Sequence, residues 1–184
     1  MSKSKSNLDD LEFKIEIATQ TLERNIGFVS NCDNKTSIVL TAFGVLFTIL
    51  LSDDGIQNLY SIISACLTEL SFTNFVYFIL LMISIIVTII GIIKLGRILI
   101  PNTSATYSTL IFFSGIQEEK NHTKYYNRFC SMTQEDLLQD LTREIYENAA
   151  IATKKYEQYT SGFKFSTIGF AMFMIVYILG VVIY

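Results

Sequence analysis

Three long runs of apolar residues constrain this 184-residue chain more than any other feature. They cover 36–52, 75–95 and 165–184, and the only Lys, Arg, Asp or Glu in them is Lys94, at the edge of the second run. Each run approaches the roughly 20 residues that one helical crossing of a bilayer needs. Strands of a membrane barrel alternate in polarity, and these runs do not. The sequence therefore predicts three transmembrane α-helices.

The distribution of positive charge predicts an orientation. None of the 14 Lys and Arg residues lies between 53 and 74, whereas they occur before the first run, at the edge of the second run (Lys94) and between the second and third. The positive-inside rule then places the N-terminus and the segment 96–164 in the cytoplasm, with the loop 53–74 outside. A largely polar stretch of about 34 residues precedes the first run, and no small-residue cleavage site follows it. We therefore expect the first run to be a retained anchor.

Two further segments have the spacing of amphipathic helices. The first has apolar residues three and four apart over 8–29: Leu8, Leu11, Ile15, Ala18, Leu22, Ile26 and Val29. The second has the same spacing over 138–163: Leu138, Leu141, Ile145, Ala149, Ala152, Tyr156, Tyr159 and Phe163. The pair Thr133 and Asp136 resembles a capping box at its start. We expect these helices to pack together, or against copies in neighbouring subunits, as a cytoplasmic bundle.

The predicted fold is an all-α integral membrane protein with three transmembrane helices. Its cytoplasmic bundle is built from the N-terminal helix and the helix before the last span. The expected division is a cytoplasmic amphipathic helix at 1–34, two transmembrane helices at 35–100 with an outer loop at 53–74, a cytoplasmic loop and helix at 101–163, and the third transmembrane helix at 164–184. A short helix is expected within the outer loop, at 56–70, lying at the interface or extending a span.

No pattern typical of an enzyme is present in the sequence. His122 is the only histidine, the nine glycines are dispersed, and the three cysteines lack metal-ligand spacing. We therefore predict no catalytic residue, metal or cofactor. Cytoplasmic basic residues could attract a phosphate, but about as many acids accompany them, and we interpret most as surface residues: Lys120, Lys124, Arg128, Arg143, Lys154 and Lys155.

Small and polar residues follow one side of the first predicted span. They are Ser37, Thr41, Gly44, Thr48 and Ser52, spaced by four, three, four and four residues. Such a strip allows close approach of another helix, or lines a water path when several subunits assemble. Both interpretations stay open. Intramembrane Asp, Glu, Arg and His are absent from the spans, which argues against an ion-coupled transporter.

Three short motifs around the spans resemble a known family. They are Asn31–Ser37 directly before the first span, Leu110–Ile116 with Tyr125 and Tyr126 downstream, and Lys155–Tyr156 ahead of the last span. In order and spacing the chain is similar to the transmembrane effectors of bacterial Pycsar antiphage systems. The resemblance implies a homo-oligomeric effector in the bacterial inner membrane that answers a cyclic pyrimidine nucleotide, cCMP or cUMP, made by a partner nucleotide cyclase. It further implies abortive infection through membrane damage, with the lipid bilayer and no nucleic acid polymer as partners.

The resemblance also implies candidate ligand-binding residues, which are Asp33, Lys35, Phe113, Gly115, Lys155 and Tyr156. A structural role is open for several of them, since Lys35 suits a membrane edge and Tyr156 falls on the apolar stripe. No β-roll nucleotide-binding domain is recognisable, so a nucleotide site would be built from the helices and the segment 101–133. Two alternative functions remain: an adaptor that recruits a partner through its coiled helices, and a small constitutive channel or toxin.

Overall fold

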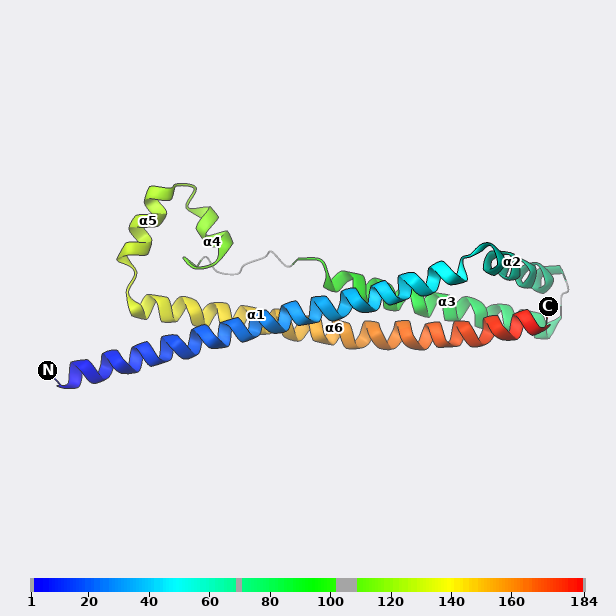
Figure 1. Ribbon diagram of the computed structural model, residues 1–184, viewed down its shortest axis with the longest axis horizontal. Helices are drawn as coiled ribbons and strands as arrows, with labels where there is room; N and C mark the ends of the chain where they lie inside the picture. Colours follow the sequence, from blue (N-terminus) through cyan, green and yellow to red (C-terminus); the bar gives the residue numbers. More distant parts are fainter. Residues whose placement is uncertain (1, 69–70, 102–108, 184) are drawn as a thin grey trace. The chain divides into compact units, whose positions relative to one another are not determined.

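A computed structural model describes residues 2–68, 71–101 and 109–183, and every regular element in these ranges is an α-helix (Figure 1). The helices are α1 (Ser2–Leu50), α2 (Asp53–Thr68), α3 (Phe72–Ile98), α4 (Phe113–Glu118), α5 (His122–Ser131) and α6 (Gln134–Ile183). Three of them, α1, α3 and α6, are long and apolar enough to cross a membrane. The all-α membrane fold with three spans is thus confirmed, and α2 confirms the short helix expected between the first two spans.

The chain divides into two compact units. The first, here the polar unit, comprises Met1–Cys32 and Pro101–Lys155. The second, here the membrane unit, comprises Asp33–Ile100 and Tyr156–Tyr184. Helices α1 and α6 contribute residues to both units, whereas α4 and α5 belong to the polar unit and α2 and α3 to the membrane unit.

In the polar unit, the N-terminal part of α1 pairs with the first half of α6. Ala18, Leu141 and Ala152 are buried between them, and the Asn25 side-chain amide donates a hydrogen bond of 3.2 Å to the carbonyl of Ile145. The predicted stripe on α1 is correct from Leu11 to Val29 except at Ile26, which is 51% exposed, and Leu8 lies outside the residues whose side chains the structure describes. Asn25 takes the inner position instead, because the inward residues repeat at alternating steps of four and three, as in a coiled coil.

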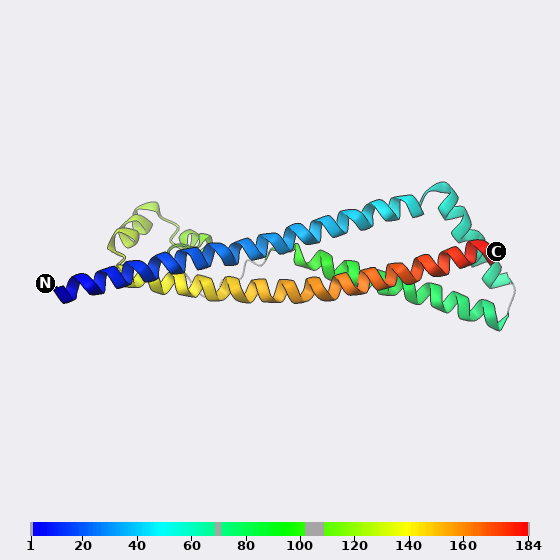
Figure 2. The same cartoon turned by 60° about the horizontal axis from the view of Figure 1, so that its bottom comes forward.

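In the membrane unit, α3 runs beside the C-terminal part of α6, as both views show (Figures 1 and 2). The core here contains large apolar side chains such as Leu81, Leu95 and Phe173. Many apolar side chains on the outer sides of the helices are exposed, for example Ile38 at 69% and Ile49 at 66%. Exposed apolar surface of this kind is what lipid covers in a membrane protein.

Local sequence explains where several helices begin and end. The Asn121 side chain accepts hydrogen bonds from the backbone N–H groups of Thr123 and Lys124, which caps α5. Helix α3 ends at Ile98, shortly before Pro101, the only proline in the chain. At the turn between α1 and α2, a Cβ on Gly55 would lie 2.0 Å from the carbonyl oxygen of Leu50, so only glycine fits there.

Candidate functional site

A polar cavity of about 280 Å³ lies in the polar unit, between the end of α5 and the start of α6. The residues that line it are Leu110, Arg128, Ser131, Met132, Asp136, Gln139, Asp140 and Arg143. This polar cavity combines two guanidinium groups, two carboxylates and a carboxamide. Its volume is near the lower end of the roughly 300–1,000 Å³ typical of small-ligand sites.

The capping box predicted at Thr133 and Asp136 is present where α6 begins. The Thr133 backbone N–H and hydroxyl donate to the Asp136 carboxylate at 3.0 and 2.7 Å, and the Asp136 N–H donates back to the hydroxyl at 3.1 Å. The hydroxyl bond, followed by the backbone bond, lowers the pKa of the Asp136 carboxyl below its ordinary value. The carboxylate at this corner of the polar cavity is therefore ionised at neutral pH.

Backbone groups of Leu110 hold one wall of the polar cavity in place. The Leu110 N–H donates to the Asp140 carboxylate at 3.0 Å, and the Tyr125 hydroxyl donates to the Leu110 carbonyl at 3.1 Å. Next to it, the Thr109 hydroxyl donates to the buried carboxylate of Glu144 at 2.6 Å. These bonds tie the segment before α4 to both α5 and α6.

Glu119, which precedes α5, pairs with two cationic residues of that helix. Its side chain is only 5% exposed and forms ion pairs with Arg128 and, at 3.0 Å, with the ammonium group of Lys124. Arg128 is also one of the residues that line the polar cavity. On α6, the Arg143 guanidinium lies 3.8 Å from an Asp140 carboxylate oxygen, which is too long for a hydrogen bond.

The predicted ligand-binding residues are divided between the two units. Gly115, Phe113 and Lys155 belong to the polar unit, whereas Asp33, Lys35 and Tyr156 belong to the membrane unit. Phe113 begins α4, and Lys155 and Tyr156 are half-buried neighbours on α6. Lys35 is exposed and Asp33 half-buried on α1. Their role as a ligand site stays a prediction.

Gly115 has a clear structural role. It is buried, and a Cβ there would lie 2.0 Å from the carbonyl oxygen of Thr109. This close approach brings α4 against the segment that forms the wall of the polar cavity. A larger residue would displace Thr109, whose hydroxyl is bonded to Glu144.

Small residues form the contact between α3 and α6 in the membrane unit. A Cβ on Gly91 would lie 2.1 Å from the backbone nitrogen of Ser166, and one on Gly169 would lie 2.5 Å from that of Thr88. Ser84, Thr88 and Ser166 are buried, and each hydroxyl donates to a carbonyl of its own helix. The backbones can therefore approach closely without leaving an unpaired hydroxyl in the membrane.

The strip on the first span faces away from the other helices of the membrane unit. All five of its residues, Ser37, Thr41, Gly44, Thr48 and Ser52, are exposed in the single chain. The hydroxyls of Ser37, Thr41 and Thr48 donate to the carbonyls four residues earlier, at 2.9–3.0 Å. Because these donors already have acceptors, the strip can contact lipid or another helix without a buried unpaired donor. Its role in packing or in a pore stays a prediction.

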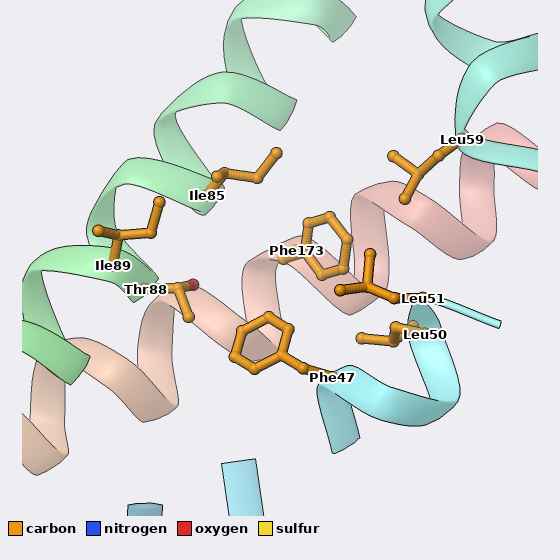
Figure 3. Close-up of a pocket in the computed structure, with 8 residues that line it drawn as sticks. All are labelled: Phe47, Leu50, Leu51, Leu59, Ile85, Thr88, Ile89 and Phe173. Carbon is orange, nitrogen blue, oxygen red and sulfur yellow. The ribbon is translucent and has the colours of Figure 1, made fainter. Parts of the chain in front are cut away.

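An apolar cavity of about 210 Å³ lies within the membrane unit. Figure 3 shows its side chains converging from α1 and the turn after it, α2, α3 and α6. They are Phe47, Leu50, Leu51, Leu59, Ile85, Thr88, Ile89 and Phe173. The Thr88 hydroxyl is the only polar side-chain group among them, and it donates to the Ser84 carbonyl. This apolar cavity therefore suits hydrocarbon and offers nothing to bind a charged ligand.

Comparison with known proteins identifies the family. Residues 17–182 match the family described as the Pycsar effector protein domain, PycTM, so the match includes residues of both units. The chain belongs to this Pycsar effector family. It is also 26% identical, over 175 residues, to the Pycsar effector protein GmPycTM of Gulbenkiania mobilis, with 85% of this chain and 87% of that protein covered. No solved structure matches the chain.

Family membership and the three apolar helices make this Pycsar effector a membrane protein of antiphage defence. The Pycsar transmembrane effectors are not known as enzymes. Among the described residues, no group of three or more His, Cys, Asp or Glu side chains is placed to hold a metal ion.

Some residues of the polar cavity lie in sequence patterns that do not predict a site. Arg128 and Arg143 are expected to be surface cations balanced by acids, and the structure places both on one cavity. The available signal was the spacing of Asp136, Gln139, Asp140 and Arg143 at steps of three, one and three, which puts them on one face of a helix. The contribution of α5 cannot be predicted from the sequence, because its position beside α6 depends on Leu110, which bonds to Asp140 and Tyr125.

Proposed function

We propose that this Pycsar effector is activated by a cyclic pyrimidine nucleotide, cCMP or cUMP, made by a partner nucleotide cyclase, and that activation impairs the bacterial inner membrane. The observation that carries the proposal is the family match over residues 17–182. The matched residues include parts of the polar unit, which is rich in polar and charged groups, and of the membrane unit, whose exposed surface is apolar. A sensor and a membrane effector in one chain need these two kinds of surface.

The proposed orientation follows from the positive charge. The N-terminus and the polar unit face the cytoplasm, where a cyclase product is available, and α2 lies at the outer side. Helix α6 supplies residues to both units and packs on α3 through Gly162 and Gly169. A ligand that stabilises one arrangement of the N-terminal part of α6 therefore acts on the same helix that contacts α3.

The energetic requirement for such a switch is substantial. A ligand that moves a two-state equilibrium from 1:99 to 99:1 must favour the active state by about 5.5 kcal/mol. Identical subunits in a homo-oligomer share this demand, because each binds its own ligand. In the proposal, the exposed strip from Ser37 to Ser52 supplies the contact between subunits in the membrane, and it is a candidate lining for a water path.

The deciding experiment is co-expression with a pyrimidine nucleotide cyclase while a potential-sensitive dye reports the membrane potential. We expect depolarisation with the active cyclase and none with a catalytically inactive one. An adaptor protein predicts no depolarisation in either case. A constitutive channel or toxin predicts depolarisation in both, so either pattern would contradict the proposal.

A second experiment tests the strip. Thr41→Lys places a charge at an exposed position of the first span, and we expect it to abolish depolarisation or assembly. Thr41→Val has nearly the same size and is the matched control, with wild-type behaviour expected. Both variants must reach the membrane fraction at equal levels. Unchanged depolarisation and oligomer size in Thr41→Lys would remove the strip from the mechanism.

A further inference from the structure

The polar cavity between α5 and α6 has the groups needed to bind a phosphodiester. Arg128 reaches it from α5 and Arg143 from α6, so two guanidinium groups from different helices line one space. Guanidinium is planar and offers paired N–H donors that match two phosphate oxygens. A phosphate bound between them would connect the end of α5 to the start of α6.

The remaining lining suits the neutral parts of a nucleotide. Asp136, Gln139 and Asp140 lie on the face of α6 that borders the cavity. Carboxylate and carboxamide oxygens accept hydrogen bonds from ribose hydroxyl or base amino groups, and the Gln139 amide can also donate to a base carbonyl. Leu110 and Met132 supply apolar surface against which a base can lie.

The charge balance of the lining selects among phosphates. Two Arg and two Asp side chains line the wall, and the charges of Glu119 and Lys124, which pair beside Arg128, cancel one another, so the group is neutral overall. The Asp136 carboxylate remains ionised because Thr133 donates to it. Such a wall accommodates one negative charge better than two or more, because every additional charge meets the two carboxylates. A cyclic monophosphate carries a single negative charge, whereas a phosphate monoester carries about −1.5 to −2 at neutral pH.

The apolar cavity in the membrane unit provides a contrast. It is lined by hydrocarbon and by one hydroxyl that already donates to a backbone carbonyl. A phosphate there would lose its hydration without gaining a partner. Of these two cavities, only the polar cavity can bind a nucleotide.

We infer that the polar cavity lined by Arg128, Arg143, Asp136 and Gln139 is the binding site for a singly charged cyclic nucleotide. The inference rests on the proposed function for the ligand class, and it adds the location, the phosphate-binding residues and the charge selectivity. It also assigns the signal to the first turns of α6, where the ligand draws α5 and α6 together.

Calorimetric titration of the full-length protein in detergent tests the site. The probes are cCMP, cUMP, 5′-CMP and inorganic phosphate. We expect one of the cyclic nucleotides to bind at least tenfold more tightly than 5′-CMP. Arg143→Gln should weaken that binding at least tenfold, and Arg143→Lys should weaken it less. Arg24→Gln, an exposed guanidinium on α1 in the same unit, is the matched control and should leave affinity unchanged.

A variant that fills the cavity separates binding from charge effects. Gln139 is exposed at the helix surface, so Gln139→Trp should leave the helix intact while it occupies the cavity. We expect it to abolish binding with no change in the far-ultraviolet circular dichroism spectrum. If wild-type protein binds a cyclic nucleotide and both Arg143→Gln and Gln139→Trp bind it equally well, the cavity assignment is wrong while the proposed function survives. If 5′-CMP binds as tightly as the cyclic nucleotides, the charge selectivity is wrong. If wild-type protein binds neither cyclic nucleotide and the cyclase causes no depolarisation, the proposed function fails and the inference with it.

Discussion

Replacing Gly91 by alanine should separate α3 from α6. The added Cβ would lie 2.1 Å from the backbone nitrogen and 2.6 Å from the Cα of Ser166, whereas ordinary contacts begin at 3.4 Å. Neither Ser166 atom can rotate away, because both belong to the backbone of a helix. The difference between 3.4 and 2.1 Å requires the two helices to move apart by about 1.3 Å at this point.

The energetic effect follows from that displacement. A gap of 0.5–1 Å already removes roughly a quarter to a half of each van der Waals contact along an interface. Overpacking of a well-packed core costs about 1–3 kcal/mol, and a backbone clash belongs at the upper end of that range. At roughly 2–4 °C per kcal/mol for a chain of this size, Gly91→Ala should lower the melting temperature by about 6–12 °C.

A matched control is available on α3 itself. Gly96 lies in the same helix as Gly91, and nothing is within 4 Å of a Cβ placed there. Gly96→Ala therefore introduces the same methyl group without a clash, and the better helix propensity of alanine makes it neutral or slightly stabilising. The two variants differ only in whether another backbone occupies the space.

The assay uses the buried cysteines of the protein. Cys32 and Cys66 are buried, whereas Cys130 is exposed. In a Cys130→Ser background, a thiol-reactive fluorophore added during heating reports when the helices separate, even if each helix stays helical. Equal melting temperatures for Gly91→Ala and Gly96→Ala would refute the close contact between α3 and α6.

Three further predictions concern single side chains. Glu119→Gln should destabilise the protein by about 1–3 kcal/mol, because a neutral amide replaces the buried carboxylate and both ion pairs are lost. Glu118→Gln, at the exposed neighbouring residue, should have no effect in the same thermal melt. Thr133→Val should cost about 1 kcal/mol through the lost cap and raise the pKa of Asp136 towards its ordinary value near 3.8, measured by denaturant unfolding and carboxyl NMR titration. Tyr77→Phe removes the hydroxyl that donates to the Val176 carbonyl at 2.7 Å and should cost about 0.6–2 kcal/mol, measured by the thiol assay.

The sign of the pH dependence follows from the Asp136 shift. A carboxyl whose pKa is lower in the folded state stabilises the fold above its unfolded pKa, near 3.8, and this contribution is lost as pH falls through the lower folded value. In Thr133→Val, the free energy of unfolding should therefore fall less as the pH is lowered through this range. Thr153→Val, at an exposed position later on α6, should keep the wild-type pH dependence. A wild-type pH dependence in Thr133→Val would contradict the cap. Equal losses of stability in Tyr77→Phe and in Tyr60→Phe, whose wild-type residue is exposed, would contradict the interhelical hydrogen bond.

The number of spans, the all-helical class and the short helix between the first two spans were predictable from sequence. Each depends on local patterns: continuous apolar runs, the three-and-four spacing of inward residues, and capping residues such as Thr133. Hydrocarbon cannot hydrogen-bond an open backbone, so an apolar run of sufficient length has almost no alternative to a helix. The family resemblance carried by short motifs was likewise confirmed by the match over 17–182.

Two features were decided only by the tertiary structure. The small residues Gly91 and Ser166 are 75 positions apart, and only the packing of α3 on α6 brings their backbones into contact, whereas the strip on the first span proved to be exposed. Arg128 and Arg143 line one cavity because the backbone of Leu110 bonds both to Asp140 on α6 and to Tyr125 on α5. Periodicity reports which face of a helix is buried, but the neighbour that buries it depends on contacts between segments distant in sequence.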